Sequence, residues 1–190
     1  MLAPNRHQSE HTLYAYKAVP PSPKSVDDLK LMVMAATELH GGCVARVAGR
    51  PWSAVTFVPS ARRPGASHPV AQLARAVRGH TPAQRFLLDL GPSIAIEGRT
   101  VLPDRFQAPP TAAGLVRGSH ALIVDDTWTS GSKAQPAALA VREAGADMVT
   151  VLCIARWCRH DWPDHRALLD RRSDPYDATI CPVTGRACPT

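Results

Sequence analysis

The stretch of residues 121–154 constrains the fold more than any other part of the chain. Ala121–Val124 is an uninterrupted apolar run, as expected of a strand buried on both faces. A turn rich in hydroxyl side chains follows, then a helical pattern over 133–144 and a second apolar run over 148–154. Pro136 is compatible only with the first turn of that helix. The stretch therefore predicts a βαβ unit with two parallel strands.

Further segments of the same kind precede this unit. Ala54–Val58 predicts a buried strand and about Val70–Arg78 a helix, while Phe86–Leu90 predicts another strand. Before them, apolar residues at helical spacing predict a helix that starts near Ser25 and stops at Gly41-Gly42. Repeated strand-loop-helix units predict an α/β fold, with a mostly parallel twisted sheet flanked by helices.

Size and composition indicate one such domain. The chain has 190 residues, of which 45% are hydrophobic and 20% charged, which is enough apolar material for a full core. We expect an N-terminal extension over 1–24, which ends in a proline-rich stretch, then the α/β domain over 25–157. Residues 158–190 form a cysteine- and histidine-containing tail that we expect to pack on the domain.

Charge and hydropathy exclude several classes of partner. The formal net charge is +6, but no block of like charges appears, so no nucleic acid partner is expected. No run approaches the roughly 18 apolar residues that span a bilayer, and the start lacks the apolar core of a signal peptide. We expect a cytoplasmic protein with no membrane association.

Chemistry-bearing side chains gather directly after the strongest strand. Asp125 and Asp126 lie at its carboxyl end, where open parallel sheets bind ligands. The hydroxyl-rich turn with Gly131 leads from them into a helix N-terminus, which attracts anions. A phosphate alone would be repelled by two carboxylates, whereas a ribose 5-phosphate offers hydroxyl donors as well as the anion. The alternative is structural, with the acids capping a turn and the hydroxyls capping the helix.

Other phosphate and catalytic motifs are absent from the sequence. The order Ser130-Gly-Ser-Lys133 lacks the first glycine of a nucleoside-triphosphate P-loop. Neither a Gly-x-Gly-x-x-Gly dinucleotide fingerprint nor a His-Glu-x-x-His zinc motif occurs.

The string from Leu122 to Ser132, Leu-Ile-Val-Asp-Asp-Thr-Trp-Thr-Ser-Gly-Ser, resembles the phosphoribosyl-pyrophosphate motif of type I phosphoribosyltransferases. The nearest resemblance is to the competence-protein-F-like and amidophosphoribosyltransferase-like branch. It implies that Asp125 and Asp126 are the catalytic acids, which bind the ribose hydroxyls. It also implies that the rest of the motif binds the 5-phosphate, with Trp128 at its variable position. That part comprises Thr127, Trp128, Thr129, Ser130, Gly131 and Ser132.

The resemblance also implies sites outside the motif. A pyrophosphate-binding loop would follow the first core strand, at Ser60, Ala61, Arg62 and Arg63. A hood over the site would come from the long proline- and glycine-rich segment 98–114, through Arg99 or Arg105. As isolated surface groups, these arginines would be unremarkable.

The implied activity is that of a magnesium-dependent transferase. It would move ribose 5-phosphate from phosphoribosyl pyrophosphate to a nitrogen nucleophile of an unidentified small-molecule acceptor, with release of pyrophosphate. Two other functions fit the same motif: a non-catalytic regulator that binds phosphoribosyl pyrophosphate or a nucleotide, and a hydrolase or phosphorylase of a ribose 5-phosphate derivative. The resemblance is also compatible with a homodimer.

Cysteines in the tail suggest a structural zinc ion. Five cysteines in a reducing compartment do not predict a disulfide framework. A tetrahedral site could use Cys158, His160, Cys181 and Cys188, with His165 or Cys43 as substitutes for the first two. The alternative is that these are free thiols and Cys153 is a buried strand residue.

Overall fold

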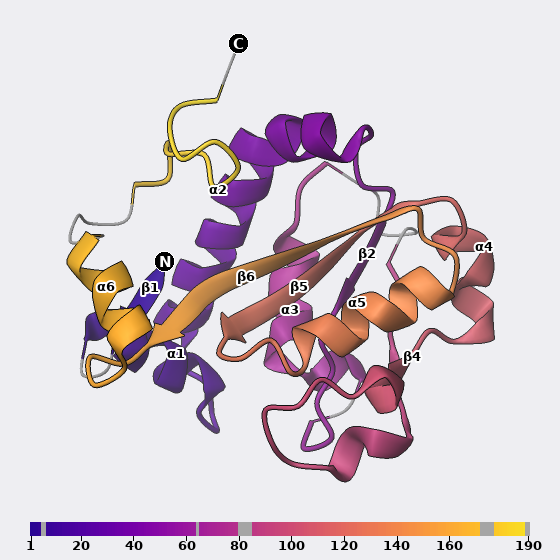
Figure 1. Ribbon diagram of the computed structural model, residues 1–190, viewed down its shortest axis with the longest axis horizontal. Coiled ribbons are helices and arrows are strands. Elements are labelled where there is room, and N and C mark those ends of the chain that lie inside the picture. Colours follow the sequence, from indigo (N-terminus) through magenta and orange to yellow (C-terminus); the bar gives the residue numbers. More distant parts are fainter. Residues whose placement is uncertain (5–6, 64, 80–84, 172–176, 189–190) are drawn as a thin grey trace.

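A four-stranded parallel sheet forms the centre of the molecule (Figure 1). The computed structural model describes residues 1–4, 7–63, 65–79, 85–171 and 177–188. Across the sheet, the order is β1, β6, β5, β2, and every neighbouring pair is parallel. The strands span Leu2–Pro4 (β1), Ala54–Phe57 (β2), His120–Trp128 (β5) and Met148–Cys158 (β6). The predicted α/β class with a mostly parallel sheet is confirmed.

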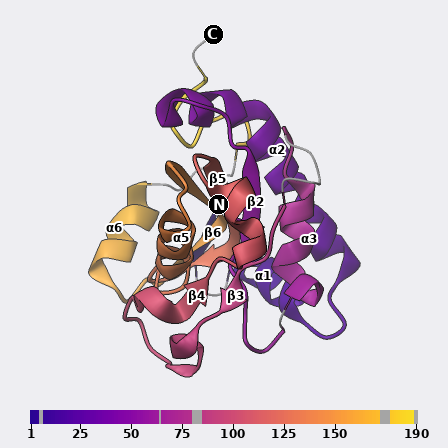
Figure 2. The same ribbon diagram turned by 90° about the vertical axis from the view of Figure 1, so that its right-hand side faces the viewer.

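Helices cover both faces of the sheet (Figure 2). Leu122 and Val124 of β5 pack with side chains of α1, α2 and α3, whereas Ala121 and Ile123 pack with α5. This alternation explains why the strand reads as a continuous apolar run: each face has its own core. The helices are α1 (Gln8–Lys17), α2 (Pro23–Ala48), α3 (Pro69–Ala76), α4 (Ala113–Val116), α5 (Ala134–Glu143) and α6 (Pro163–Arg171). In the described part of the chain, no helix has both the length and the apolar character of a membrane span.

The N-terminal residues are built into this layered structure. β1 pairs with the outer edge of β6, and the α-amino group of Met1 donates to the carbonyl of Ile154 at 2.7 Å. Leu13 and Tyr16 of α1 are buried in the core. Residues 1–24, predicted as an extension, thus supply the edge strand β1 and the covering helix α1. The last turn of α1 lies near the carboxyl end of β5.

Helix α2 corrects the predicted stop at Gly41-Gly42. It runs without a break through both glycines and ends at Gly49, whose φ of 78° is left-handed. A Cβ on Gly41 would lie 2.8 Å from the indole of Trp52, so Gly41 lets that ring pack on the helix. Packing along the whole length of α2 outweighs the low helix propensity of two glycines.

The predicted strand Phe86–Leu90 is also corrected. The amide of Phe86 donates to Val55 at 3.1 Å beside β2, but the chain then leaves the main sheet. Only Asp89–Leu90 is a strand (β3), antiparallel to β4 (Phe106–Gln107). The cause is Gly91, whose approach to the carbonyl of Asp104 leaves no room for a Cβ. The described loops also contain short 3₁₀ turns: η1 (Gly65–Ser67), η3 (Pro92–Ala95), η4 (Pro103–Arg105) and η5 (Pro110–Ala112).

His120 is a fully buried polar side chain at the start of β5. One ring nitrogen lies 2.9 Å from the carbonyl of Arg50, and the other lies 2.9 Å from the hydroxyl of Thr150. We expect His120→Ala to lower the free energy of unfolding by about 3 kcal/mol, because it leaves a cavity in the core and removes the partner of two part-buried polar groups. Urea unfolding measures this cost, and a loss below about 1 kcal/mol would contradict the buried network.

Candidate active site

A cleft of about 890 Å³ opens at the carboxyl ends of β2 and β5. It collects most of the segments that the sequence singled out, although these are up to 70 residues apart in the chain. Its lining includes Ser60, Ala61, Arg62, Arg63, Arg105, Asp125, Asp126, Thr127, Trp128, Thr129, Gly131 and Ser132, together with Lys17, Tyr14 and Trp157. Because β5 continues to pair with β6 as far as Trp128, the acids belong to the strand itself.

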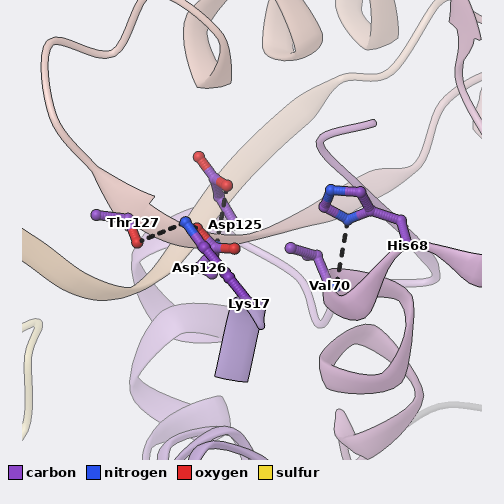
Figure 3. A network of polar contacts seen from close by, with 6 residues as sticks. All are labelled: Lys17, His68, Val70, Asp125, Asp126 and Thr127. Carbon is purple, nitrogen blue, oxygen red and sulfur yellow. Dashed lines mark hydrogen bonds and ion pairs between the residues drawn. The ribbon is translucent and has the colours of Figure 1, made fainter. Parts of the chain in front are cut away.

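A lysine from helix α1 forms an ion pair with one of the two acids (Figure 3). The ammonium of Lys17, in the last turn of α1, lies 2.8 Å from Oδ1 of Asp126. It also lies 3.4 Å from the hydroxyl of Thr127. The side chain of Asp126 is 8% exposed and that of Lys17 is 45% exposed, so the cleft wall holds the acid while the lysine reaches it from solvent. No sequence motif marks Lys17, because its position depends on how α1 packs.

Burial shifts the ionisation of Asp125. Desolvation, followed by the neighbouring charge of Asp126, raises the pKa of Asp125 from its ordinary 3.8 to about 7. One oxygen of Asp125 accepts the amide of Asp126 at 2.9 Å. The two neighbouring carboxylates therefore favour the binding of a proton, a hydroxyl donor or a cation between them.

The turn after the acids has a backbone conformation that suits anion binding. Gly131 has a φ of +80°, and the hydroxyl of Ser130 accepts the amide of Ser132 at 3.4 Å. Helix α5 begins at Ala134 without a side-chain cap on its N-terminus. A helix start of this kind, facing a cleft, can bind a phosphate through backbone N–H groups.

Trp128 stabilises this turn. A Cβ on Gly131 would lie 2.6 Å from Cζ2 of Trp128, so the indole lies directly against the glycine. The ring is half-buried and packs on the core beneath α5. The motif's variable position thus forms part of the wall of the cleft.

The predicted pyrophosphate loop borders the same cleft. A tight turn forms as the amide of Arg63 donates to the carbonyl of Ser60 and the amide of Arg62 donates to its hydroxyl, both at 3.3 Å. The guanidinium of Arg63 donates to the carbonyl of Lys17 at 3.1 Å, which ties the loop to α1. Arg62 is exposed. The cleft lining therefore contains cationic groups as well as carboxylates.

The two hood candidates occupy different positions. Arg105 lines the cleft but is buried, and its guanidinium donates to the carbonyl of Ile96 at 2.8 Å, which holds the loop 94–98 at the cleft rim. Arg99 is exposed and its guanidinium lies 5.2 Å from the ring centre of Trp162, outside the cleft lining. Arg105 therefore positions a rim loop, and Arg99 packs against the tail.

His68 has a local structural role. Its Nδ1 accepts the amide of Val70 at 3.2 Å and so caps α3 (Figure 3). The ring stacks on Phe57 at 6.0 Å between centres. Burial lowers the pKa of His68, which keeps the ring neutral as a cap requires.

Two of the four residues suggested as zinc ligands lie together in the structure, and two lie elsewhere. Cys181 and Cys188 do come together, but with His40 of α2, all three donor atoms lying within 4.8 Å of one another. Cys158 lies at the end of β6, where its thiol donates to the carbonyl of Arg156 at 3.7 Å, and His160 lies just beyond it. The reason is the path of the tail: it returns over α2, away from the end of β6 (Figure 1).

Comparisons with known proteins give fold similarities only. No family profile matches the chain, and no curated protein matches it in sequence. Among solved structures it is similar to the allosteric regulatory enzyme of purine biosynthesis, at 24% identity and a TM-score of 0.37, over 64% of this chain and 26% of that chain. A phosphoribosyltransferase from Corynebacterium diphtheriae shares 19% identity at a TM-score of 0.38, over 79% of this chain and 92% of that chain. A hypoxanthine phosphoribosyltransferase from Staphylococcus aureus shares 11% identity at a TM-score of 0.42, over 80% of this chain and 70% of that chain.

These similarities concern the fold and do not identify the chemistry of the cleft. The chain spans about a quarter of the first of these structures, 26% of its length. Two of the three are named as phosphoribosyltransferases, the family whose motif the sequence resembles.

Proposed function

We propose that this chain is a phosphoribosyltransferase that uses phosphoribosyl pyrophosphate and magnesium to transfer ribose 5-phosphate to a nitrogen nucleophile. The observation that carries the proposal is the combination of a carboxylate pair, an uncapped helix start and a basic loop in one cleft. A ribose 5-phosphate with a pyrophosphate on C1 has hydroxyls, one terminal phosphate and a second anionic group to match them.

Each wall of the cleft has a defined role in this reaction. The carboxylates of Asp125 and Asp126 accept hydrogen bonds from the ribose hydroxyls, and the turn at Gly131 binds the 5-phosphate through backbone amides. Arg62 and Arg63 neutralise the pyrophosphate. The half-buried indole of Trp128 limits the access of water to the sugar.

The residues at the acid pair fit a divalent cation. Carboxylate oxygens are the donors that magnesium prefers, and Asp126 already holds a cation in the form of the Lys17 ammonium. Asp125 and Asp126 are the groups that would hold the ion on the protein side. Magnesium would supply positive charge that offsets the charge of the departing pyrophosphate.

The reaction exchanges one bond at C1 for another. The acceptor nitrogen forms a bond to C1 while the bond from C1 to the pyrophosphate oxygen breaks, and pyrophosphate leaves with the electron pair. The nitrogen then loses its proton to solvent or to the leaving group. The side chains of the cleft position and shield the reactants, with no covalent intermediate on the protein.

Incubation with phosphoribosyl pyrophosphate, magnesium and pooled nitrogen acceptors tests the function. We expect pyrophosphate release together with a product whose mass equals that of the acceptor plus ribose 5-phosphate less water. Pyrophosphate release without such a product would indicate a hydrolase instead. Binding in calorimetry without release would indicate a regulator, and absence of binding would contradict the site itself.

Lys17 gives a specific test of the basic wall. It lies between Asp126 and the loop that carries Arg63, so we expect it to contact pyrophosphate oxygens once substrate binds. Lys17→Met keeps the apolar stem and should raise the KM for phosphoribosyl pyrophosphate about tenfold, the loss of one charged hydrogen bond. Lys24→Met on the exposed side of α2 is the matched control and should leave KM unchanged. An unaltered KM in Lys17→Met would remove the lysine from the site.

A further inference from the structure

The C-terminal tail is held to α2 by cysteines rather than by an apolar core. Among the described residues 177–188, only Cys181 is buried. The larger apolar side chains there, Ile180 and Val183, are about half exposed. A segment that buries a thiol and exposes its apolar side chains needs another source of stability.

Three potential metal ligands meet where the tail crosses α2, and a fourth, Cys43, lies one turn further along the helix. Nδ1 of His40 lies 3.1 Å from the sulfur of Cys188, and Cys181 completes a group whose donor atoms are within 4.8 Å of one another. Cys43 lies one helical turn after His40, so both side chains project from the same face of α2. The thiol of Cys43 is buried.

The histidine is oriented as a metal ligand requires. Its Nε2 lies 2.8 Å from the carbonyl of Ala178, an acceptor only, so Nε2 carries the proton. Nδ1 is then unprotonated and presents its lone pair to the sulfurs. A backbone carbonyl that fixes the tautomer in this way is the usual outer partner of a metal-bound histidine.

Backbone hydrogen bonds close a tight turn around Cys181. Its own amide donates to the carbonyl of Arg186 at 2.9 Å, and its carbonyl accepts the amide of Gly185 at 2.8 Å. Gly185 has a φ of 70°, which closes the turn.

We propose that His40, Cys43, Cys181 and Cys188 bind one structural zinc ion that fastens the C-terminal tail to helix α2. Three thiolates and one imidazole form a donor set that suits tetrahedral zinc, with all four positions filled by protein. Helix α2 contributes no residue to the lining of the cleft, and the proposed zinc site shares no residue with that lining. It is independent of the proposed transferase activity.

Metal analysis of the full chain is the first test. We expect about one zinc per chain after purification without chelators, and less than about a tenth of that in Cys181→Ser and Cys43→Ser. Cys158→Ser is the matched control, because Cys158 is a buried cysteine outside the cluster, and it should keep its zinc. Zinc retained by Cys181→Ser but lost from Cys158→Ser would overturn the ligand set.

Cobalt and proteolysis provide readouts if a variant does not fold. Cobalt added to metal-free wild-type protein should give visible bands of tetrahedral geometry and thiolate charge transfer. Removing the metal should speed cleavage within 177–188 at least about tenfold, and adding zinc back should reverse this. Absence of zinc together with no cobalt uptake would overturn the proposal. So would iron in place of zinc, or a thiol titration that finds a disulfide among these cysteines.

Discussion

Asp125→Asn/Asp126→Asn should lower turnover of phosphoribosyl pyrophosphate at least about a thousandfold. The two carboxylates are the acceptors for the ribose hydroxyls, and each charged hydrogen bond contributes about 2 kcal/mol. Asparagine keeps the shape of the side chain and can still accept the amide of residue 126, so the strand end should stay in place. Pyrophosphate release at saturating acceptor measures the loss.

The matched control is Asp147→Asn, at the opposite end of the sheet. Asp147 is exposed and pairs with Arg50 at 3.2 Å, outside the cleft. Its activity should equal that of the wild type. Unchanged binding of phosphoribosyl pyrophosphate by the double variant in calorimetry would contradict the assignment of both acids.

Stability offers a second readout that separates a lost site from a lost fold. Since the pKa of Asp125 is raised from 3.8 to about 7, the folded chain holds this proton more tightly than the unfolded chain does. The stabilisation from the protonated acid is therefore complete below about pH 4 and lost as the pH rises through 7. Asp125→Asn carries no such charge, so its Tm should exceed that of the wild type by about 2–4 °C at pH 8. The difference should vanish at pH 4, and a lower Tm at pH 8 would contradict the burial of this carboxylate.

Gly131→Ala should weaken binding of the 5-phosphate at least about fiftyfold. At a φ of +80° any side chain is strained, and the new Cβ would meet the indole of Trp128 at 2.6 Å. The ring is packed on the core, so the turn must move, and with it the amides that face the phosphate. Calorimetry with ribose 5-phosphate measures the turn without the pyrophosphate half of the site.

A helical glycine supplies the control for this substitution. Gly42 lies in α2, and no neighbouring atom would lie within 4 Å of an added Cβ. Gly42→Ala should leave binding unchanged and raise the free energy of unfolding by up to about 1 kcal/mol. If Gly131→Ala bound ribose 5-phosphate as tightly as Gly42→Ala, the turn would not be the phosphate site.

Local sequence determined the central part of the fold. The apolar run of β5, the turn after it and Pro136 at the helix start specify a strand-turn-helix unit through short-range preferences alone. The two acids lie within the strand near its carboxyl end, a place that could be predicted from their position in the chain. Where one local rule opposed packing, as at Gly41-Gly42, packing prevailed.

Only the tertiary structure decided which distant residues join these segments. Lys17 reaches Asp126 because α1 packs beside the sheet, and His40 meets Cys181 because the tail turns back over α2. Of the zinc ligands that the sequence suggested, Cys181 and Cys188 lie together, whereas Cys158 lies apart from them at the end of β6. Adjacent residues share a site through chain geometry, whereas residues more than 100 positions apart share one only through how the layers pack, which no local pattern records.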